Sequence, residues 1–503
     1  MASHLKALTD TGSSALSHRV SGRPRSLRDD EDAALAAYAR GLIESGSPAT
    51  RGLMQEEANR LRSRRDPPAA PVTKHWWQRW KARNPWVQTA DSMHRPAATT
   101  EKYHPFNTKF NPEHVILPKG HAKETGRKRM LVACVLDRDQ EIPLRDGLHA
   151  YADIFRPASS DETKVPAVIC WSPYGKSSIS VDNIWHRSGV PKDWTSGYET
   201  FEGLDPADWC RRGYAVVNVD ARGCRFSEGT YSFWGEQEAQ DIYDTIDFLS
   251  RQTWCNGSVC MGGSSYLAKA QVNFASKQSH PALKALAPWE GFTDIYRQLF
   301  RRGGFAMNNT FAARYQWAIA GNHDEVEDMA QMVTAHPLFD DYWADKDDDI
   351  SKIGVPLYVL GSFNNPFHVQ GSFDTFRRAR STKKWMRVHS SFAWYEMYEP
   401  NSNNDLQRFF DRFCKGIMNG WESDTPPLRL SLYGLGSIPN VVERPETTFP
   451  LARQRLETFY LDAATKSLHG SPREEESSTS HQSHGLEAPS SVSSATSTTE
   501  PAH

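Results

Sequence analysis

The sequence predicts an α/β domain over residues 129–425, preceded by a small all-α module and followed by a short β segment. Two observations predict the α/β class. From residue 165 onward, short apolar runs alternate with amphipathic helical stretches, which is typical of a parallel sheet covered by helices. The apolar run Val259-Cys260-Met261 then passes through small residues into a helical stretch, and a sharp strand-to-helix turn of this kind presents a serine, here Ser264 or Ser265.

Composition limits the class of protein further. The chain has 503 residues, which is too long for one compact domain, and its formal net charge of -2 argues against a protein that binds nucleic acid over its whole surface. The seven cysteines have neither the spacing of a metal site nor an even number for disulfide pairing. No apolar run is long enough to cross a bilayer. We therefore expect a cytoplasmic or nuclear protein with reduced thiols, no membrane partner, no metal and no cofactor.

The N-terminal part of the chain predicts a helical module. Residues 1–25 are polar, Ser-rich and aperiodic, so we expect them to be disordered. Residues 26–90 contain three amphipathic stretches that begin at acidic or capping residues. The first ends before Gly46, the second before Pro67 and the third before Pro85. Three short helices with a basic last helix are a candidate helix-turn-helix.

This module resembles the helix-turn-helix of CENP-B and pogo-type transposases in its acidic start, its Ser47-Pro48-Ala49-Thr50-Arg51 turn and its Trp76-Trp77-Gln78-Arg79-Trp80 end. The resemblance implies that the last helix enters the major groove of DNA. The residues that it nominates as DNA-facing are Lys74, Gln78, Arg79, Lys81 and Arg83. Two alternatives stay open: a helical bundle whose basic side chains only face water, and a module fused to an unrelated domain.

Residues 91–128 are polar and lack periodicity, so we expect a linker that merges into the first strands of the α/β domain. The strands are expected at the apolar runs. In chain order these runs are residues 130–135, 149–155, 165–171, 214–219, 259–261, 283–287, 357–360 and 385–388. Amphipathic helices are expected at 237–251 and 405–417. Aromatic-rich helical stretches from about residue 291 to 350 interrupt the alternation.

The serine turn reads Gly263-x-Ser265-Tyr266-x-Ala268. It resembles the turn of the cocaine-esterase-like (CocE/NonD) hydrolases in the X-Pro dipeptidyl-peptidase superfamily, which reads Gly-x-Ser-Tyr-x-Gly, with Ala268 in place of the last glycine. Further blocks that resemble the family follow in the family's order. They are Ile142-Pro143-Leu144-Arg145-Asp146-Gly147, Ser172-Pro173-Tyr174-Gly175-Lys176, Asp220-Ala221-Arg222-Gly223, Asp241-Ile242-Tyr243-Asp244-Thr245-Ile246, Trp254-Cys255-Asn256-Gly257, Ala287-Pro288-Trp289-Glu290-Gly291 and Arg408-Phe409-Phe410-Asp411.

The resemblance implies an α/β-hydrolase fold over residues 129–425, with a helical cap at approximately 291–350. In the family a β jelly roll follows. Here only residues 426–462 have strand-like character, so we expect a truncated β segment there. Residues 463–503 are rich in Ser, Glu, His and Thr and are expected to form a disordered tail.

The serine turn nominates the first catalytic group. A serine hydroxyl needs an imidazole base, an orienting carboxylate and donors for the oxyanion before it attacks a carbonyl. We expect Ser265 to be the nucleophile, with Ser264 as the alternative. The resemblance implies that the backbone N–H of Tyr266 and the phenol of Tyr174 form the oxyanion hole.

The base and the acid are less clear from the sequence. At the position of the family's aspartate stands Asn364, which could hold an imidazole tautomer but carries no charge. Glu290 follows an earlier strand and is the alternative acid. His389 follows the last predicted strand and is our first choice for the base, with His368 as the rival.

Together these features predict a serine hydrolase that cleaves an ester or amide bond of a small molecule through an acyl-enzyme. The aromatic-rich cap suggests a substrate with an apolar or aromatic group. Two alternatives remain: a catalytically impaired relative that only binds, and a DNA-associated protein that acts through its N-terminal module. A homodimer is also left open.

Overall fold

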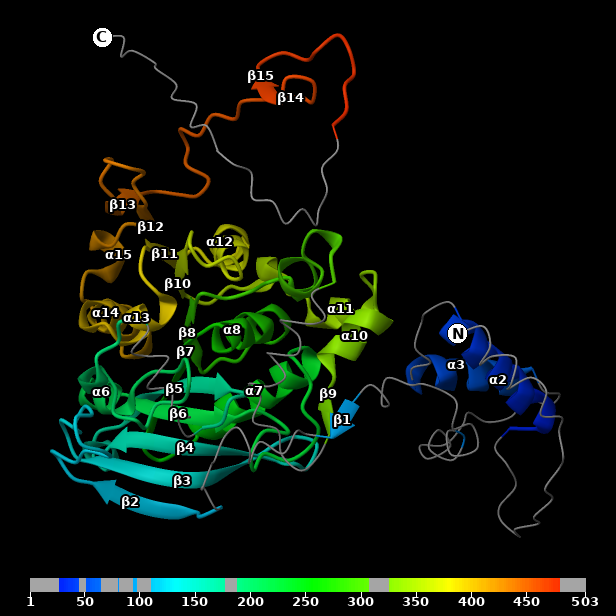
Figure 1. Cartoon of the computed structure of the whole chain (residues 1–503). Helices are drawn as coiled ribbons and strands as arrows, with labels where there is room; N and C mark the ends of the chain where they lie inside the picture. The colour runs from blue at the N-terminus through cyan, green and yellow to red at the C-terminus, as the bar shows by residue number, and fades with distance from the viewer. Residues whose placement is uncertain are drawn as a thin grey trace, which may run out of the picture. The chain divides into compact units, whose positions relative to one another are not determined.

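The computed structural model describes residues 27–44, 51–64, 80, 94–96, 110–176, 188–306 and 325–479 (Figure 1). The chain divides into two compact units, Met1–Phe449 and Pro450–His503, and each is considered by itself. Within the described part, no helix is both long enough and apolar enough to cross a membrane. All seven cysteines are buried and unpaired.

The N-terminal helices form where the sequence predicts them. Helices α2 (Asp29–Glu44) and α3 (Arg51–Ser63) correspond to the first two predicted stretches. The side chains of their shared core are Leu27, Leu35, Ala36, Ala39, Met54, Ala58 and Trp80. Because Trp80 comes from the third predicted stretch and is fully buried, all three stretches contribute to one core. The rest of the third stretch, including Lys74, Gln78, Arg79, Lys81 and Arg83, lies outside the described residues.

The α/β domain is built on one sheet of eleven strands (Figure 1). From one edge to the other, the strands are β13 (Val441–Glu446), β12 (Leu428–Leu432), β11 (Lys384–His389), β10 (Leu357–Ser362), β8 (Leu283–Trp289), β7 (Cys255–Ser264), β5 (Val165–Ser172), β6 (Ala215–Asp220), β4 (His149–Pro157), β3 (Cys134–Pro143) and β2 (Glu113–Leu117). The strands from β12 to β6 pair in parallel, and the outer pairs are antiparallel. The six consecutive buried residues of β6 and the eight of β5 suit central parallel strands, which are covered on both faces.

One predicted strand is misplaced. We expected a strand at 130–135, but β3 runs over Cys134–Pro143. The stretch from Asp137 to Glu141 is polar, and three of its five side chains are only partly buried. Because β3 lies between two antiparallel neighbours near the edge of the sheet, these polar side chains are tolerated there, and the apolar pattern that marks the inner strands is weak.

Helices pack against both sides of the sheet. Figure 1 shows α13 and α14 on one side of β7 and β8, and α8 on the other. The helices of this domain are α6 (Pro206–Arg211), α7 (Glu236–Ser250), α8 (Tyr266–Lys277), α10 (Met329–Ala335), α11 (Asp341–Lys346), α12 (Val369–Arg378), α13 (Ala393–Tyr398), α14 (Pro400–Cys414) and α15 (Trp421–Asp424). The one-turn elements are Ala158–Asp161, Lys192–Trp194, Tyr296–Phe300, Arg302–Gly304 and Ile350–Lys352.

The described part of the expected cap region, about 291–350, contains α10, α11, three short helical elements and the strand β9 (Glu325–Glu327), which pairs with β1 (His94–Pro96). The buried Lys269 of α8 forms an ion pair of 2.5 Å with Asp348 and joins this region to the domain.

The expected β segment at 426–462 extends the main sheet. β12 pairs in parallel with β11, and β13 pairs antiparallel with β12. In the second unit, β14 (Tyr460–Asp462) pairs with β15 (Ser467–His469).

Candidate active site

Ser265 lies at the turn between β7 and α8 in a strained conformation. Its φ of 58° and ψ of -113° are rare for a residue with a side chain. Its backbone N–H donates to the carbonyl oxygens of Trp289, at 3.1 Å, and Glu290, at 3.0 Å. These bonds hold the turn against the end of β8, so that the serine stands where a nucleophile elbow presents it.

Two glycines make room for this turn. Gly263 has a φ of 139°, and a Cβ there would lie 2.6 Å from Leu267 Cβ and 3.1 Å from the carbonyl oxygen of Glu202. A Cβ on Gly291 would lie 3.1 Å from Ala268 Cβ. Ala268 stands where the resemblance expects a glycine, and the absence of a side chain at Gly291 leaves space for its methyl group.

Glu290 follows β8 directly and accepts contacts from two histidines. It is fully buried and has a φ of 56°, a value that is uncommon for a residue with a side chain. Its Oε1 lies 2.8 Å from His389 Nε2, and its Oε2 lies 3.3 Å from His368 Nδ1. Burial alone would raise the pKa of Glu290, but the hydrogen bonds and charge of the histidines outweigh it and lower the pKa to about 2. Glu290 is therefore ionised between the two imidazoles. In the described part of the chain, no group of three or more His, Cys, Asp or Glu is arranged to hold a metal ion.

The two histidines differ in their remaining ring nitrogen. His389 ends β11, and its Nδ1 lies 3.3 Å from the hydroxyl of Ser391, so both of its nitrogens are occupied. His368 precedes α12, and its Nδ1 contacts both Glu290 and the side-chain amide of Asn365, at 2.7 Å. His368 Nε2 makes no hydrogen bond to any residue that the structure describes. His368 Nδ1 therefore faces the Asn365 amide at 2.7 Å and Glu290 Oε2 at 3.3 Å, whereas His389 Nε2 makes the hydrogen bond to Glu290.

The hydrogen-bond partners of Asn364 are groups other than the two histidines. It is exposed, and its amide donates to the hydroxyl of Tyr433 at 2.7 Å and to the carbonyl of Ser391 at 3.3 Å. Across the described residues it makes no hydrogen bond to His368 or His389. The geometry favours Glu290 over Asn364 as the group that orients a base.

Both tyrosines named for the oxyanion hole are buried beside Ser265. Tyr174 follows β5, and its ring lies 6.1 Å from that of Tyr266. The phenol of Tyr266 donates to Glu238 Oε1 at 2.6 Å, and its ring stacks on Trp234 with centroids 4.7 Å apart. Glu238 and Trp234 thus hold the Tyr266 side chain in place. The backbone N–H of Tyr266 is the part of this residue that lies at the turn.

Glu202 is a site residue that the sequence did not reveal. It stands in the loop between β5 and α6, and its Oε1 accepts a hydrogen bond of 3.0 Å from the indole of Trp394. The Tyr174 phenol, the Ser265 hydroxyl and the Tyr266 N–H also lie against its carboxyl group. Burial raises the pKa of Glu202 to about 8, although these donors lower it in part. The sequence Phe201-Glu202-Gly203 matches no catalytic motif. Only the folded structure reveals that Glu202 lies beside Ser265.

The resting position of Ser265 follows from the same contacts. Its hydroxyl faces Glu202, and among the described residues no hydrogen bond joins it to either histidine.

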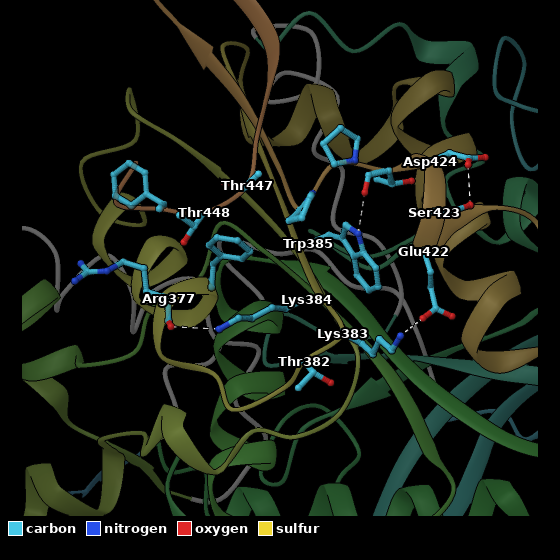
Figure 2. A pocket seen from close by; sticks show the side chains of 15 residues that line it. Arg377, Thr382, Lys383, Lys384, Trp385, Glu422, Ser423, Asp424, Thr447 and Thr448 are labelled. Atoms are coloured by element: carbon cyan, nitrogen blue, oxygen red, sulfur yellow. Dashed lines mark hydrogen bonds and ion pairs between the residues drawn. The ribbon is translucent and has the colours of Figure 1, made fainter. Parts of the chain in front are cut away.

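A separate groove of about 530 Å³ lies at the opposite end of β11 (Figure 2). Its wall includes Lys384 and Trp385 at the start of the strand, whereas His389 stands at the strand's end, about 17 Å away at 3.3 Å per residue. Figure 2 shows Lys383 paired with Glu422, and Lys384 donating to the carbonyl of Arg377. Because ligands of α/β sheets bind beyond the carboxyl ends of the strands, this groove is not the place for the chemistry.

Comparison with known proteins shows which families the chain resembles. Residues 146–391 match the family model of the X-Pro dipeptidyl-peptidase (S15 family), and residues 29–89 match that of the Tc5 transposase DNA-binding domain. The cocaine esterase of Rhodococcus sp. (strain MB1 Bresler) is 32% identical over 167 residues, which are 33% of this chain and 25% of the esterase. A Mycobacterium bovis protein named as a serine esterase is 30% identical over 171 residues, 32% of this chain and 26% of that protein. The chain thus spans about a quarter of the length of these curated relatives.

A solved structure extends the likeness to most of the fold. The CocE/NonD family hydrolase from Staphylococcus aureus superposes with a TM-score of 0.64 at 30% sequence identity, over 73% of this chain and 64% of that one. The matches confirm the recognition made from the sequence: a CocE/NonD-like hydrolase domain with the α/β-hydrolase fold, preceded by a transposase-type DNA-binding module.

Proposed function

We propose, on the premise that residues 146–391 form an S15-family hydrolase domain, that the chain is a serine-dependent hydrolase of ester or amide bonds in small molecules. One observation carries the proposal. The ionised Glu290 is held by His389 and His368 directly beside the strained Ser265 turn, and the Glu290 carbonyl itself accepts the Ser265 N–H. A carboxylate, an imidazole and a strained serine in one place are the parts of a triad.

The mechanism assigns one task to each group. In the tautomer that carries its proton on Nδ1, which faces Glu290 Oε2 at 3.3 Å and requires the Asn365 amide to turn away, His368 removes through Nε2 the proton of the Ser265 hydroxyl as that oxygen attacks the substrate carbonyl. The Tyr266 N–H and the Tyr174 phenol stabilise the oxyanion that forms. His368 then gives the proton to the leaving group, and water releases the acyl group by the same steps. His389 binds the other oxygen of Glu290 and positions it.

The choice between the two histidines is directly testable. We expect Ser265→Ala to abolish labelling by a fluorophosphonate probe and turnover of a p-nitrophenyl ester. His368→Ala should lower kcat by about 10³-fold or more, and His389→Ala by clearly less, because only the first removes the base. His280→Ala, which breaks a histidine–aspartate pair outside the site, is the matched control.

Two other results would change the proposal. If His389→Ala abolished labelling while His368→Ala kept it, the base would be His389. Absence of labelling in the unmodified protein would show that the domain has the fold without the activity, and a binding role would replace hydrolysis.

Association with DNA through the N-terminal module is a second candidate function. The match of residues 29–89 to a transposase DNA-binding domain favours it, as does the single core that α2, α3 and Trp80 share. The test is binding of the full chain to duplex DNA at increasing salt, since contacts to phosphates weaken linearly in a plot of log affinity against log salt concentration. No binding at low salt would contradict this function.

A further inference from the structure

We propose that Glu202, held in its protonated form, is a third donor of the oxyanion hole beside Tyr266 and Tyr174. The inference rests on the proposed hydrolase activity and adds a catalytic residue to it. Neither the serine motif nor the comparisons assign any role to Glu202.

The loop of Glu202 is held in place by bonds from several elements. The residue has a φ of 65°, a strained value for a side chain of its size. Its carbonyl accepts the Ser264 N–H at 3.0 Å, and the carbonyl of Gly203 accepts the Tyr398 hydroxyl at 3.1 Å. Thr200 Oγ1 donates to the carbonyl of Gly175 at 2.8 Å. Strain persists only where surrounding contacts determine the backbone, and it concentrates at functional sites.

The two oxygens of Glu202 have different surroundings. Oε1 accepts the indole N–H of Trp394 at 3.0 Å. Oε2 is buried and has no hydrogen bond of normal geometry with any residue in the described part of the chain. In the protonated acid, with Oε1 accepting from Trp394, the proton resides on Oε2. The Ser265 hydroxyl, the Tyr174 phenol and the Tyr266 N–H lie against the same carboxyl group, so the acid proton belongs to the group of donors expected around an oxyanion.

The charges around Glu202 favour the neutral acid. Within its own loop the titratable neighbours are Glu199 and Asp205, and from α13 the phenol of Tyr398 faces the same cluster. The remaining neighbours of the carboxyl, on β5, α8 and α13, are uncharged donors. None of the described groups that act most strongly on this carboxyl is a cation, and a carboxylate would repel a developing oxyanion.

The direction of the pH dependence follows from this arrangement. Burial, the largest effect, raises the pKa of Glu202 to about 8, so the donor is present below that pH and is lost above it. We therefore expect kcat to fall as the pH rises through about 8. Neutral buried carboxylic acids that donate to an oxyanion are known in other enzyme classes.

The test compares Glu202→Gln with Glu202→Ala in the full chain, using p-nitrophenyl ester turnover between pH 5 and about 10, a range that brackets the pKa. Gln keeps an N–H donor and an oxygen for Trp394 but cannot ionise. We expect Glu202→Gln to keep kcat within about threefold and to lose the alkaline decrease. Glu202→Ala should lower kcat by about 10²-fold with little change in KM, the usual loss for one oxyanion donor.

Glu199→Gln is the matched control, because burial also raises the pKa of Glu199 to about 8 in the same loop. It should keep both the kcat and the alkaline decrease of the unmodified protein. The inference is overturned if Glu202→Gln loses as much activity as Glu202→Ala, if both keep full activity, or if Glu199→Gln removes the alkaline decrease. Fluorophosphonate labelling of the unmodified protein tests the hydrolase activity separately. If the unmodified protein is not labelled, both the hydrolase activity and the role of Glu202 are refuted. If it is labelled, the variants test the role of Glu202 alone.

Discussion

Two buried glutamates beside Ser265 have opposite protonation states. Glu290 and Glu202 both stand in loops that follow strands, and both have positive φ angles, 56° and 65°. Two histidines lower the pKa of Glu290 to about 2, whereas burial among uncharged donors raises the pKa of Glu202 to about 8. The first is a carboxylate at neutral pH, and the second is mainly a neutral acid.

The difference shows that burial alone does not decide what a carboxyl group does. Burial raises the pKa in both cases, and the partners decide the outcome. Groups that can carry positive charge contact Glu290, while neutral donors contact Glu202. Two carboxyl groups whose pKa values are driven apart are a recurring basis for dividing catalytic roles.

The largest effect is expected from Glu290→Gln, which removes the charge between the histidines. We expect kcat to fall by about 10³- to 10⁴-fold, because a neutral amide neither stabilises an imidazolium nor fixes its tautomer. The measurement is steady-state ester hydrolysis, with the melting temperature as a check on folding. Glu422→Gln, which neutralises a carboxylate in the groove of Figure 2, should leave kcat unchanged. Equal losses in the two variants would contradict a specific role for Glu290.

A smaller effect is expected from His389→Gln, which can still donate to Glu290 but carries no charge. The pKa of Glu290 should rise from about 2, because the charge of His389 is one of the causes that lower it. A depressed carboxyl pKa contributes stability above its ordinary value of 4.5 that is lost as the pH falls towards 2. The variant should therefore lose less stability than the unmodified protein as the pH falls from about 5 to 2, as measured by urea unfolding. An unchanged acid profile would contradict this coupling.

A modest shift is expected from Trp394→Phe, which removes the indole donor from Glu202 Oε1. That hydrogen bond favours the carboxylate and lowers its pKa, so the pKa of Glu202 should move above about 8. The alkaline decrease in kcat should move to higher pH, with kcat at pH 7 changed by about twofold or less. Movement of the decrease to lower pH would show that the indole favours the neutral acid instead.

The smallest effect is expected from Glu199→Gln on stability. In the folded chain, burial followed by the charge of Asp205 raises the pKa of Glu199 from 4.5 to about 8. Stability from this group is present below pH 4.5 and is lost as the pH rises through about 8, since the unfolded chain releases the proton first. The variant should reduce the difference in melting temperature between pH 5 and 8 by a few degrees. A larger difference would contradict the raised pKa.

Local patterns in the sequence were sufficient for most elements and for the turn that presents Ser265. The apolar runs placed the parallel strands from β5 to β11 within a few residues, because a central strand must be apolar on both faces. The turn at Ser265 was recognisable because few residue types fit so sharp a strand-to-helix transition. Both features depend on residues close together in the chain, where periodicity and steric limits act directly.

The groups that lie beside Ser265 depend on contacts that no local pattern specifies. Glu290 and His389 are 99 residues apart and meet because β10 pairs with both β8 and β11. This register sets Ser362 beside His389 and Leu360 beside Trp289, so the ends of the three strands lie at one edge. Glu202 reaches the same edge through a strained loop. The ionisation of each carboxyl group follows from these long-range neighbours, so its role could be assigned only after folding had placed them.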